Sequence, residues 1–78
     1  MVRRERYEMP DDVYRLLVDW DLMFRYEERP AYQRNDYLGW IDRAKQSETR
    51  RKRIDQMLAE LDEGGIYMKM EHPPSARD

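Results

Sequence analysis

The sequence of 78 residues contains no cysteine and only one histidine. Without cysteine the chain can form no disulfide, no thiolate metal ligand and no cysteine nucleophile. A secreted domain of this size usually needs disulfides for stability, so their absence favours a cytoplasmic protein. The one histidine, His72, precedes Pro73 and Pro74 in a polar stretch and has no neighbour that would orient it for catalysis.

Long apolar runs are also missing from the sequence. The basic residues at the N-terminus are not followed by the apolar segment that a signal peptide requires. No window approaches the roughly 18 apolar residues of a membrane-spanning helix. We therefore expect a cytoplasmic protein without a membrane span.

The motifs of common enzymes are absent as well. The sequence contains no HExxH, no GxSxG, no glycine-rich phosphate loop and no paired spacing of metal ligands. Acidic residues are plentiful, but acid–base catalysis needs a pocket that shifts their pKa values, and so short a chain rarely encloses one. We expect a non-enzymatic protein, with no catalytic residue, cofactor, metal site or small-molecule substrate.

What the sequence has in abundance is charge: 41% of its residues are charged and its mean hydropathy is -1.17. A chain of this length accommodates one domain, whose core contributes roughly 3–5 kcal/mol of net stability. Because 12% of the residues are aromatic and the apolar residues are periodic, we predict a folded domain. Its expected parts are a flexible leader over 1–9, an all-α domain over 10–65 and an extended or disordered tail over 66–78.

A first helix is predicted after Pro10, where Asp11 and Asp12 suit the cap and the first turn. The apolar residues that follow recur at i, i+3, i+4 and i+7, the spacing of one helix face: Val13, Leu16, Leu17 and Trp20. This stripe predicts that Trp20 lies in the core. The same reasoning applies to Phe24, Tyr37 and Trp40, for which an aromatic ligand cage is the less favoured interpretation.

Asp19 and Asp21 interrupt the first stripe before Leu22, Met23 and Tyr26 begin another. We predict a break here and a short second helix over about 21–28, capped by Asp19 or Asp21. The alternative is one continuous helix from 11 to 27.

A third helix is predicted to open at Pro30, whose missing N–H costs nothing at the first helical position. Its apolar face repeats the i, i+3, i+4, i+7 spacing: Tyr37, Trp40, Ile41 and Ala44. Gly39 weakens this helix slightly or lets a neighbouring segment approach closely.

A fourth helix is predicted to begin with Ser47 as its cap and to stop at Gly64-Gly65. Its apolar face consists of Ile54, Met57, Leu58 and Leu61. The sequence thus predicts a bundle of three to four helices, in which the last two form an antiparallel hairpin about Gln46-Ser47. Beyond this bundle the apolar residues alternate over 66–70, which predicts an extended segment lying across the helices, or one through which the chain associates with itself.

The fourth helix carries its charges in an unusual order. Four basic residues, 50–53, crowd its first turns and acidic residues lie at its end, whereas the helix dipole favours the reverse. An anion bound at the N-terminus of this helix would compensate for the unfavourable positions of the basic residues. We predict an anion or acidic-protein site where four side chains converge near the turn: Lys45, Thr49, Arg50 and Arg53.

Two alternatives explain the same basic residues. In the first, which is the favoured one, Arg50 and Arg53 only pair with carboxylates across the bundle, with Glu27, Glu28, Asp36 and Asp42 as candidates. In the second, the stripe from Arg43 to Arg53 and the nearby aromatic residues bind nucleic acid. The acidic pI of 5.4 argues against this second alternative.

The region around this turn resembles a known family. From Trp40 to Ile54 the sequence reads W-I-x-x-A-K-x-x-E-T-R-x-x-R-I. This string is similar to the C-terminal helical region of proteins described as bacteriocin-protection, YdeI or OmpD-associated, and the resemblance covers roughly residues 9–65. It implies a small helical accessory or interaction module with a protein partner, which could be a second copy of the chain.

Overall fold

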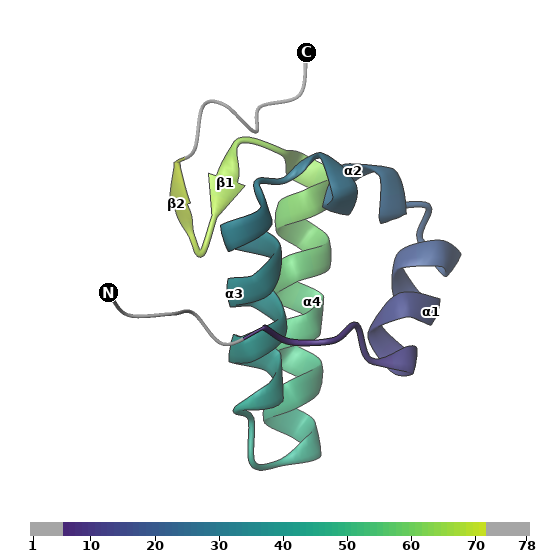
Figure 1. The fold of residues 1–78 in the computed structure, drawn as a ribbon, viewed down its shortest axis with the longest axis vertical. Coiled ribbons are helices and arrows are strands. Elements are labelled where there is room, and N and C mark those ends of the chain that lie inside the picture. The colour runs from purple at the N-terminus through teal and green to yellow at the C-terminus, as the bar shows by residue number, and fades with distance from the viewer. Residues whose placement is uncertain (1–5, 72–78) are drawn as a thin grey trace.

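The computed structural model describes residues 6–71, which form four helices and one β-hairpin (Figure 1). The predicted all-α class is confirmed, with the small hairpin added after the last helix. In chain order the elements are α1 (Asp11–Asp19), α2 (Met23–Glu28), α3 (Ala31–Asp42), α4 (Ser47–Glu63), β1 (Ile66–Tyr67) and β2 (Met70–Glu71).

The two longest helices, α3 and α4, form the centre of the domain. They lie antiparallel and side by side, joined by residues 43–46 close to the predicted connection (Figure 1). α1 and the hairpin lie on opposite sides of this pair. Within residues 6–71 no helix combines the length and the apolar character that a membrane crossing needs.

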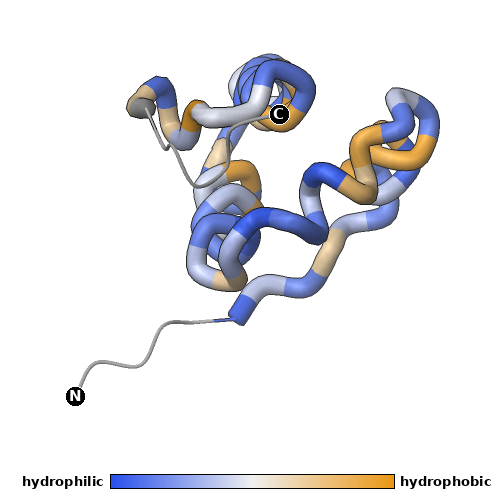
Figure 2. Tube along the Cα trace, turned by 90° about the horizontal axis from the view of Figure 1, so that it is seen from above, coloured by the Kyte–Doolittle hydropathy of each residue, from blue (hydrophilic) through white to orange (hydrophobic). Residues whose placement is uncertain are grey.

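The core forms where the predicted apolar faces meet. Figure 2 shows the hydrophobic positions, in orange, along a tube that is otherwise blue or pale. The face of α4 is confirmed in full, because all four of its predicted residues are buried. The buried apolar side chains are Val13, Leu17, Leu22, Tyr26, Tyr37, Leu38, Ile41, Ile54, Met57, Leu58 and Leu61. Each contributes roughly 1.5–3 kcal/mol relative to an exposed position.

The predicted break between the first two helices is present, and the continuous alternative is wrong. α1 ends at Asp19, and Asp21 adopts a left-handed conformation with φ 55°. Asp tolerates this conformation better than most residues. The Leu22 N–H then donates to the Leu17 carbonyl at 2.8 Å, which brings Leu22 into the core.

The predicted helix caps are less accurate than the predicted helices. The residues at the N-cap positions are Pro10, Leu22, Pro30 and Gln46. Caps at Asp19 or Asp21 and at Ser47 were expected from residue type and are wrong. The carbonyl that accepts the first helical hydrogen bond decides the cap, and in α4 this is the Gln46 carbonyl, which accepts from Arg50 N–H at 2.9 Å.

The structure differs from the expected leader in the part that it describes, from Arg6 onward. Tyr7 and Met9 pack against the core, and the Tyr7 N–H donates to the Asn35 side chain at 2.9 Å. The close approach expected at Gly39 is made by Tyr7, since a Cβ on Gly39 would lie 2.6 Å from the Tyr7 ring. Residues 1–5 of the expected leader lie outside the described range.

The segment after α4 folds back as a hairpin. Gly64 and Gly65 end the helix with positive φ values of 76° and 72°, as predicted. β1 then pairs with β2 across a two-residue turn at Met68 and Lys69, both left-handed. The expected extended segment therefore pairs with itself and lies against the helices, while residues 72–78 of the expected tail lie outside the described range.

Candidate functional site

The four residues of the predicted anion site lie before α4 and in its first two turns. Lys45 is exposed and Thr49 is half-buried. Arg50 binds Asp12 at the start of α1 through two hydrogen bonds, Nε to Oδ2 at 3.1 Å and Nη2 to Oδ1 at 3.0 Å. Arg53 donates to the Trp40 carbonyl at 2.6 Å, and its guanidinium lies 5.3 Å from the centre of the indole ring. Both arginines are engaged within the chain, and anion binding at this turn stays a prediction.

The partner of Arg50 is not one of the four carboxylates expected for cross-bundle pairing. Asp12 makes the direct contact, and Asp42 acts on Arg50 only through its charge. The Arg50 hydrogen bond holds the pKa of the Asp12 carboxyl below its usual value. The pair joins the beginnings of two helices that are far apart in sequence, so helical periodicity alone could not indicate it.

The remaining basic residues of α4 also have acceptors nearby. Arg51 pairs with Asp55 at 2.9 Å, and Lys52 pairs with Glu48 at 3.6 Å, both across one helical turn. Such exposed pairs contribute little stability individually. A nucleic acid bound along this stripe would have to compete with these carboxylates for the same cations.

At the other end of α4, the acidic residue Glu60 is buried, with 5% of its surface exposed. Its carboxylate accepts hydrogen bonds from the Met68 and Lys69 N–H groups, each at 2.9 Å, and from Gln56 Nε2 at 3.0 Å. It also accepts from the Tyr37 hydroxyl. Burial, and then the hydrogen bond to Glu60, raise the pKa of Tyr37 far above its usual value. The turn of the hairpin thus compensates the negative charge that the dipole of α4 disfavours.

A second buried charge, Arg29, completes this polar cluster, with 4% of its surface exposed. Its guanidinium donates to the Glu60 carbonyl at 3.0 Å, to the Ile66 carbonyl at 2.7 Å and to Gln33 Oε1 at 3.2 Å. These bonds tie the end of α2 to the end of α4 and to β1. The cluster is closed and serves the fold, and within residues 6–71 no group of three or more acidic or histidine residues could hold a metal ion.

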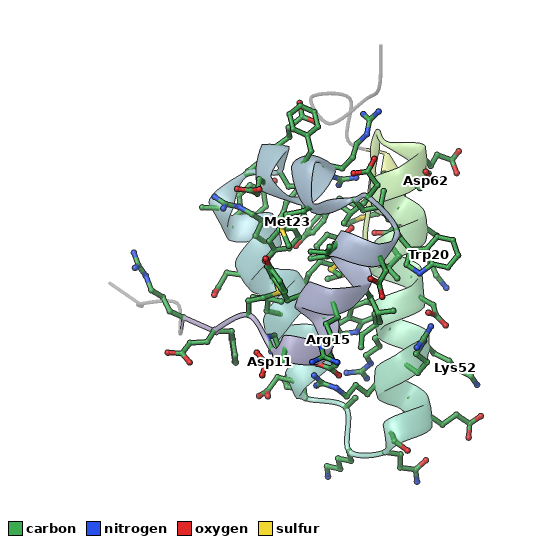
Figure 3. The ribbon with its side chains drawn as sticks, turned by 90° about the vertical axis from the view of Figure 1, so that its right-hand side faces the viewer. Asp11, Arg15, Trp20, Met23, Lys52 and Asp62 are labelled. Carbon is green, nitrogen blue, oxygen red and sulfur yellow. The ribbon has the colours of Figure 1, made fainter. Side chains whose placement is uncertain are left out.

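The exposed aromatic residues of α1 and α2 contradict the sequence prediction. Trp20, expected in the core, is 64% exposed, and Phe24 is 69% exposed. Because α1 ends at Asp19 and the chain reverses at Asp21, Trp20 no longer follows the buried stripe, and Leu22 takes the core position instead. Figure 3 shows Trp20 projecting beside α4, below Asp62.

Trp20 stands between two hollows of the surface. One has a volume of about 350 Å³ and lies between the α1–α2 connection and α4. The other, of about 520 Å³, continues along α2 past Phe24. We call the combined lining of the two hollows the Trp20 surface. Its apolar residues, called its floor, are Trp20, Leu22, Phe24, Leu58 and Ala59, and its charged residues, called its rim, are Asp21, Arg25, Arg51, Asp55 and Asp62.

One signal in the sequence could have indicated this surface. The aspartates that flank Trp20 on both sides mark it as lying at a break, where a stripe no longer determines direction. Nothing in the sequence indicated that Arg29 or Glu60 would be buried, because their partners come from distant segments.

Comparison with known families places most of this chain in one of them. A family model described as bacteriocin-protection, YdeI or OmpD-associated matches residues 6–64, which include α1 to α4 and the Trp20 surface. Comparisons with curated proteins and with solved structures find no significant match. The chain therefore belongs to the bacteriocin-protection, YdeI or OmpD-associated family.

Proposed function

We propose that this chain is a non-enzymatic interaction module that binds a protein segment in which an apolar side chain is flanked by basic residues. The observation that carries this proposal is the Trp20 surface. A tryptophan and a phenylalanine that are both largely exposed and line the same hollow leave apolar area in contact with water. Tryptophan is also enriched among the residues that dominate protein interfaces.

The shape of the Trp20 surface supports an apolar contact. The smaller hollow has Leu22, Leu58 and Ala59 in its lining, and Trp20 forms one side of it. An apolar side chain placed there would contact the indole ring and α4 together. Burial of such a contact is favourable at about 25 cal/mol per Å² of apolar area.

The charges of the rim indicate the nature of the flanking residues. Asp21, Asp55 and Asp62 outnumber Arg25 and Arg51, and Arg51 is already paired with Asp55. An excess of carboxylates around an apolar floor favours a basic partner and disfavours an acidic one. The Trp20 surface is thus distinct in place and in charge from the predicted anion site before α4.

The proposal is tested by NMR titration of the ¹⁵N-labelled chain with two synthetic peptides of equal length, one built from Leu and Lys and one from Leu and Glu. We expect saturable chemical-shift changes over 18–25 and 51–62 with the basic peptide. High salt should lower the affinity for this peptide. Trp20→Ala should weaken binding at least tenfold, which corresponds to about 1.4 kcal/mol. Tyr14→Ala is the matched control, because Tyr14 is an exposed aromatic residue on α1, the helix that Trp20 follows, but does not line either hollow.

Other patterns of shifts would contradict the proposal. Binding of the acidic peptide with shifts over 45–53 would instead support the predicted anion site at Lys45, Thr49, Arg50 and Arg53. A short single-stranded DNA that shifts residues 43–53 would support the nucleic-acid alternative. Equal binding by the chain and by its Trp20→Ala variant would remove the Trp20 surface from consideration.

A further inference from the structure

A third hollow lies on α2 and α3, next to the N-terminal segment, and shares no lining residue with the Trp20 surface. We propose that this hollow, the Arg34 groove, binds a small organic anion: a carboxylate or phosphate group carried on a flat apolar body. The groove has a volume of about 530 Å³, and the residues that the proposal uses are Arg6, Tyr7, Tyr26, Tyr32, Arg34 and Leu38.

The first observation is the state of the Arg34 side chain. Its Nε atom is shielded from solvent and donates no hydrogen bond to any atom of residues 6–71. Buried donors in folded proteins are nearly always paired, and a buried N–H that lacks an acceptor is unfavourable. Arg29, at the end of α2, by contrast has three acceptors for its guanidinium. Arg34 also lines the groove, so a shift of its side chain toward a bound oxyanion would give this donor the acceptor that the described residues do not supply.

The second observation is the charge of the lining. Arg6 and Arg34 both line the groove, and among the lining residues within the described range 6–71 none is acidic. The chain as a whole has a net charge of -2, whereas the charged residues described along this hollow are both basic. Arg34 also acts on the neighbouring Tyr26, because its positive charge opposes the rise in the pKa of Tyr26 that burial causes.

The third observation is the character of the walls. Three tyrosine rings, those of Tyr7, Tyr26 and Tyr32, line the groove together with the buried Leu38. Aromatic rings provide a surface on which a flat apolar body can stack. A guanidinium group binds the two oxygens of a carboxylate or phosphate through parallel hydrogen bonds. The groove is open to solvent, and its volume lies within the range of small-molecule sites.

The groove is tested by NMR titration with three probes: benzoate, inorganic phosphate and benzyl alcohol. Benzoate carries both the anion and the ring, phosphate only the anion, and benzyl alcohol only the ring. We expect saturable shifts at Tyr7 and over 31–38 with benzoate, with a Kd on the order of 1 mM. Phosphate and benzyl alcohol should each bind at least tenfold more weakly than benzoate.

Three variants assign the binding to the arginines. Arg34→Gln should weaken benzoate binding at least tenfold, and Arg6→Gln, on an exposed residue, should weaken it less without affecting the fold. Arg15→Gln is the matched control, since Arg15 is exposed on α1 and lines none of the three hollows. Unchanged benzoate affinity in both Arg34→Gln and Arg6→Gln would overturn the proposal. So would equal affinity for benzoate and benzyl alcohol, or for benzoate and phosphate.

Discussion

Asp12 is the residue at which the start of α1 meets the start of α4. Its carboxylate accepts two hydrogen bonds from Arg50 and one from the Val13 N–H at 2.9 Å, so it serves a contact within α1 and one between helices. Both side chains of the pair are partly exposed, at 55% for Asp12 and 27% for Arg50. Solvent therefore screens the pair, and its contribution to stability is small despite the two-bond geometry.

The pair makes stability depend on pH in the acidic range. Because the pKa of Asp12 is lower in the folded chain than in the unfolded one, mainly through the Arg50 hydrogen bond, the pair stabilises the fold above pH 4 or so. That stabilisation is lost as the pH falls through the lowered pKa. A double-mutant cycle with Asp12→Asn and Arg50→Gln, measured by urea unfolding at pH 7, should give a coupling free energy of about 0.2–1 kcal/mol.

The same cycle at pH 2 should give a smaller coupling, because the carboxylate becomes protonated as the pH falls through its lowered pKa. The cycle with Glu48→Gln and Lys52→Gln is the control for a pair within one helix, with an expected coupling of about 0.3–0.5 kcal/mol. Equal coupling for Asp12 and Arg50 at the two pH values would show that the contact does not depend on charge.

The hairpin is the element that shows how a short segment can become ordered. A two-stranded hairpin is marginal by itself in water. Here the two N–H groups of its turn donate to the Glu60 carboxylate, and Tyr67 packs edge-on against Tyr32 and Tyr37, with ring centres 6.0 Å and 5.4 Å apart. The order of this element therefore comes from α3 and α4 and not from its own strands.

Glu60→Gln tests this dependence at the scale of the hairpin. Each carboxylate oxygen accepts two hydrogen bonds, so a glutamine in either orientation would turn its NH2 group toward two donors. We expect a loss of about 1–3 kcal/mol in the free energy of unfolding. Hydrogen exchange at the Met68 and Lys69 amides should also become faster relative to amides in the middle of α4.

The control for this variant is Glu63→Gln, on an exposed residue at the end of the same helix. It should change the free energy of unfolding by less than about 0.5 kcal/mol. If Glu60→Gln unfolded at the same urea concentration as Glu63→Gln, the hydrogen bonds to the turn would not hold the hairpin in place.

At the scale of the whole molecule, a small apolar core is supplemented by a buried polar cluster. Arg29 and Glu60 connect α2, α4 and the hairpin through main-chain groups. If the partner of a buried charge is removed, the charge stays buried but unpaired, and this destabilises the fold strongly. The hairpin is thus part of the folded domain, and self-association through 66–70 stays a prediction.

A truncation after Gly65 tests the contribution of the hairpin to the entire fold. It removes the Ile66 carbonyl from Arg29 and both turn N–H groups from Glu60. We expect a loss of at least about 3 kcal/mol, comparable with the whole net stability of a domain of this size, as measured by circular dichroism during urea unfolding. A truncated chain that unfolds at the same urea concentration but changes its sedimentation behaviour would instead support self-association through 66–70.

Several features of this fold could be predicted because they depend on neighbours in sequence. Ile54 and its i+3, i+4 and i+7 partners are buried as their spacing requires, and Gly64 ends α4 with a positive φ. The break near Asp21 was also predicted. The candidate sites were harder to predict from the sequence. Arg50, predicted to bind an anion, is paired with Asp12, and Trp20, predicted to lie in the core, is exposed.

The sequence by itself determined the positions of the last two helices, most of the buried helix faces and the end of α4, since a helical stripe and a glycine stop are set within about one or two turns of chain. Only the tertiary structure decided that Trp20 is exposed, which carboxylate Arg50 binds, and that Arg29 and Glu60 are buried. The physical reason is that these outcomes depend on hydrogen bonds and packing between segments far apart in the chain. Residue spacing carries no information about the distance between such segments.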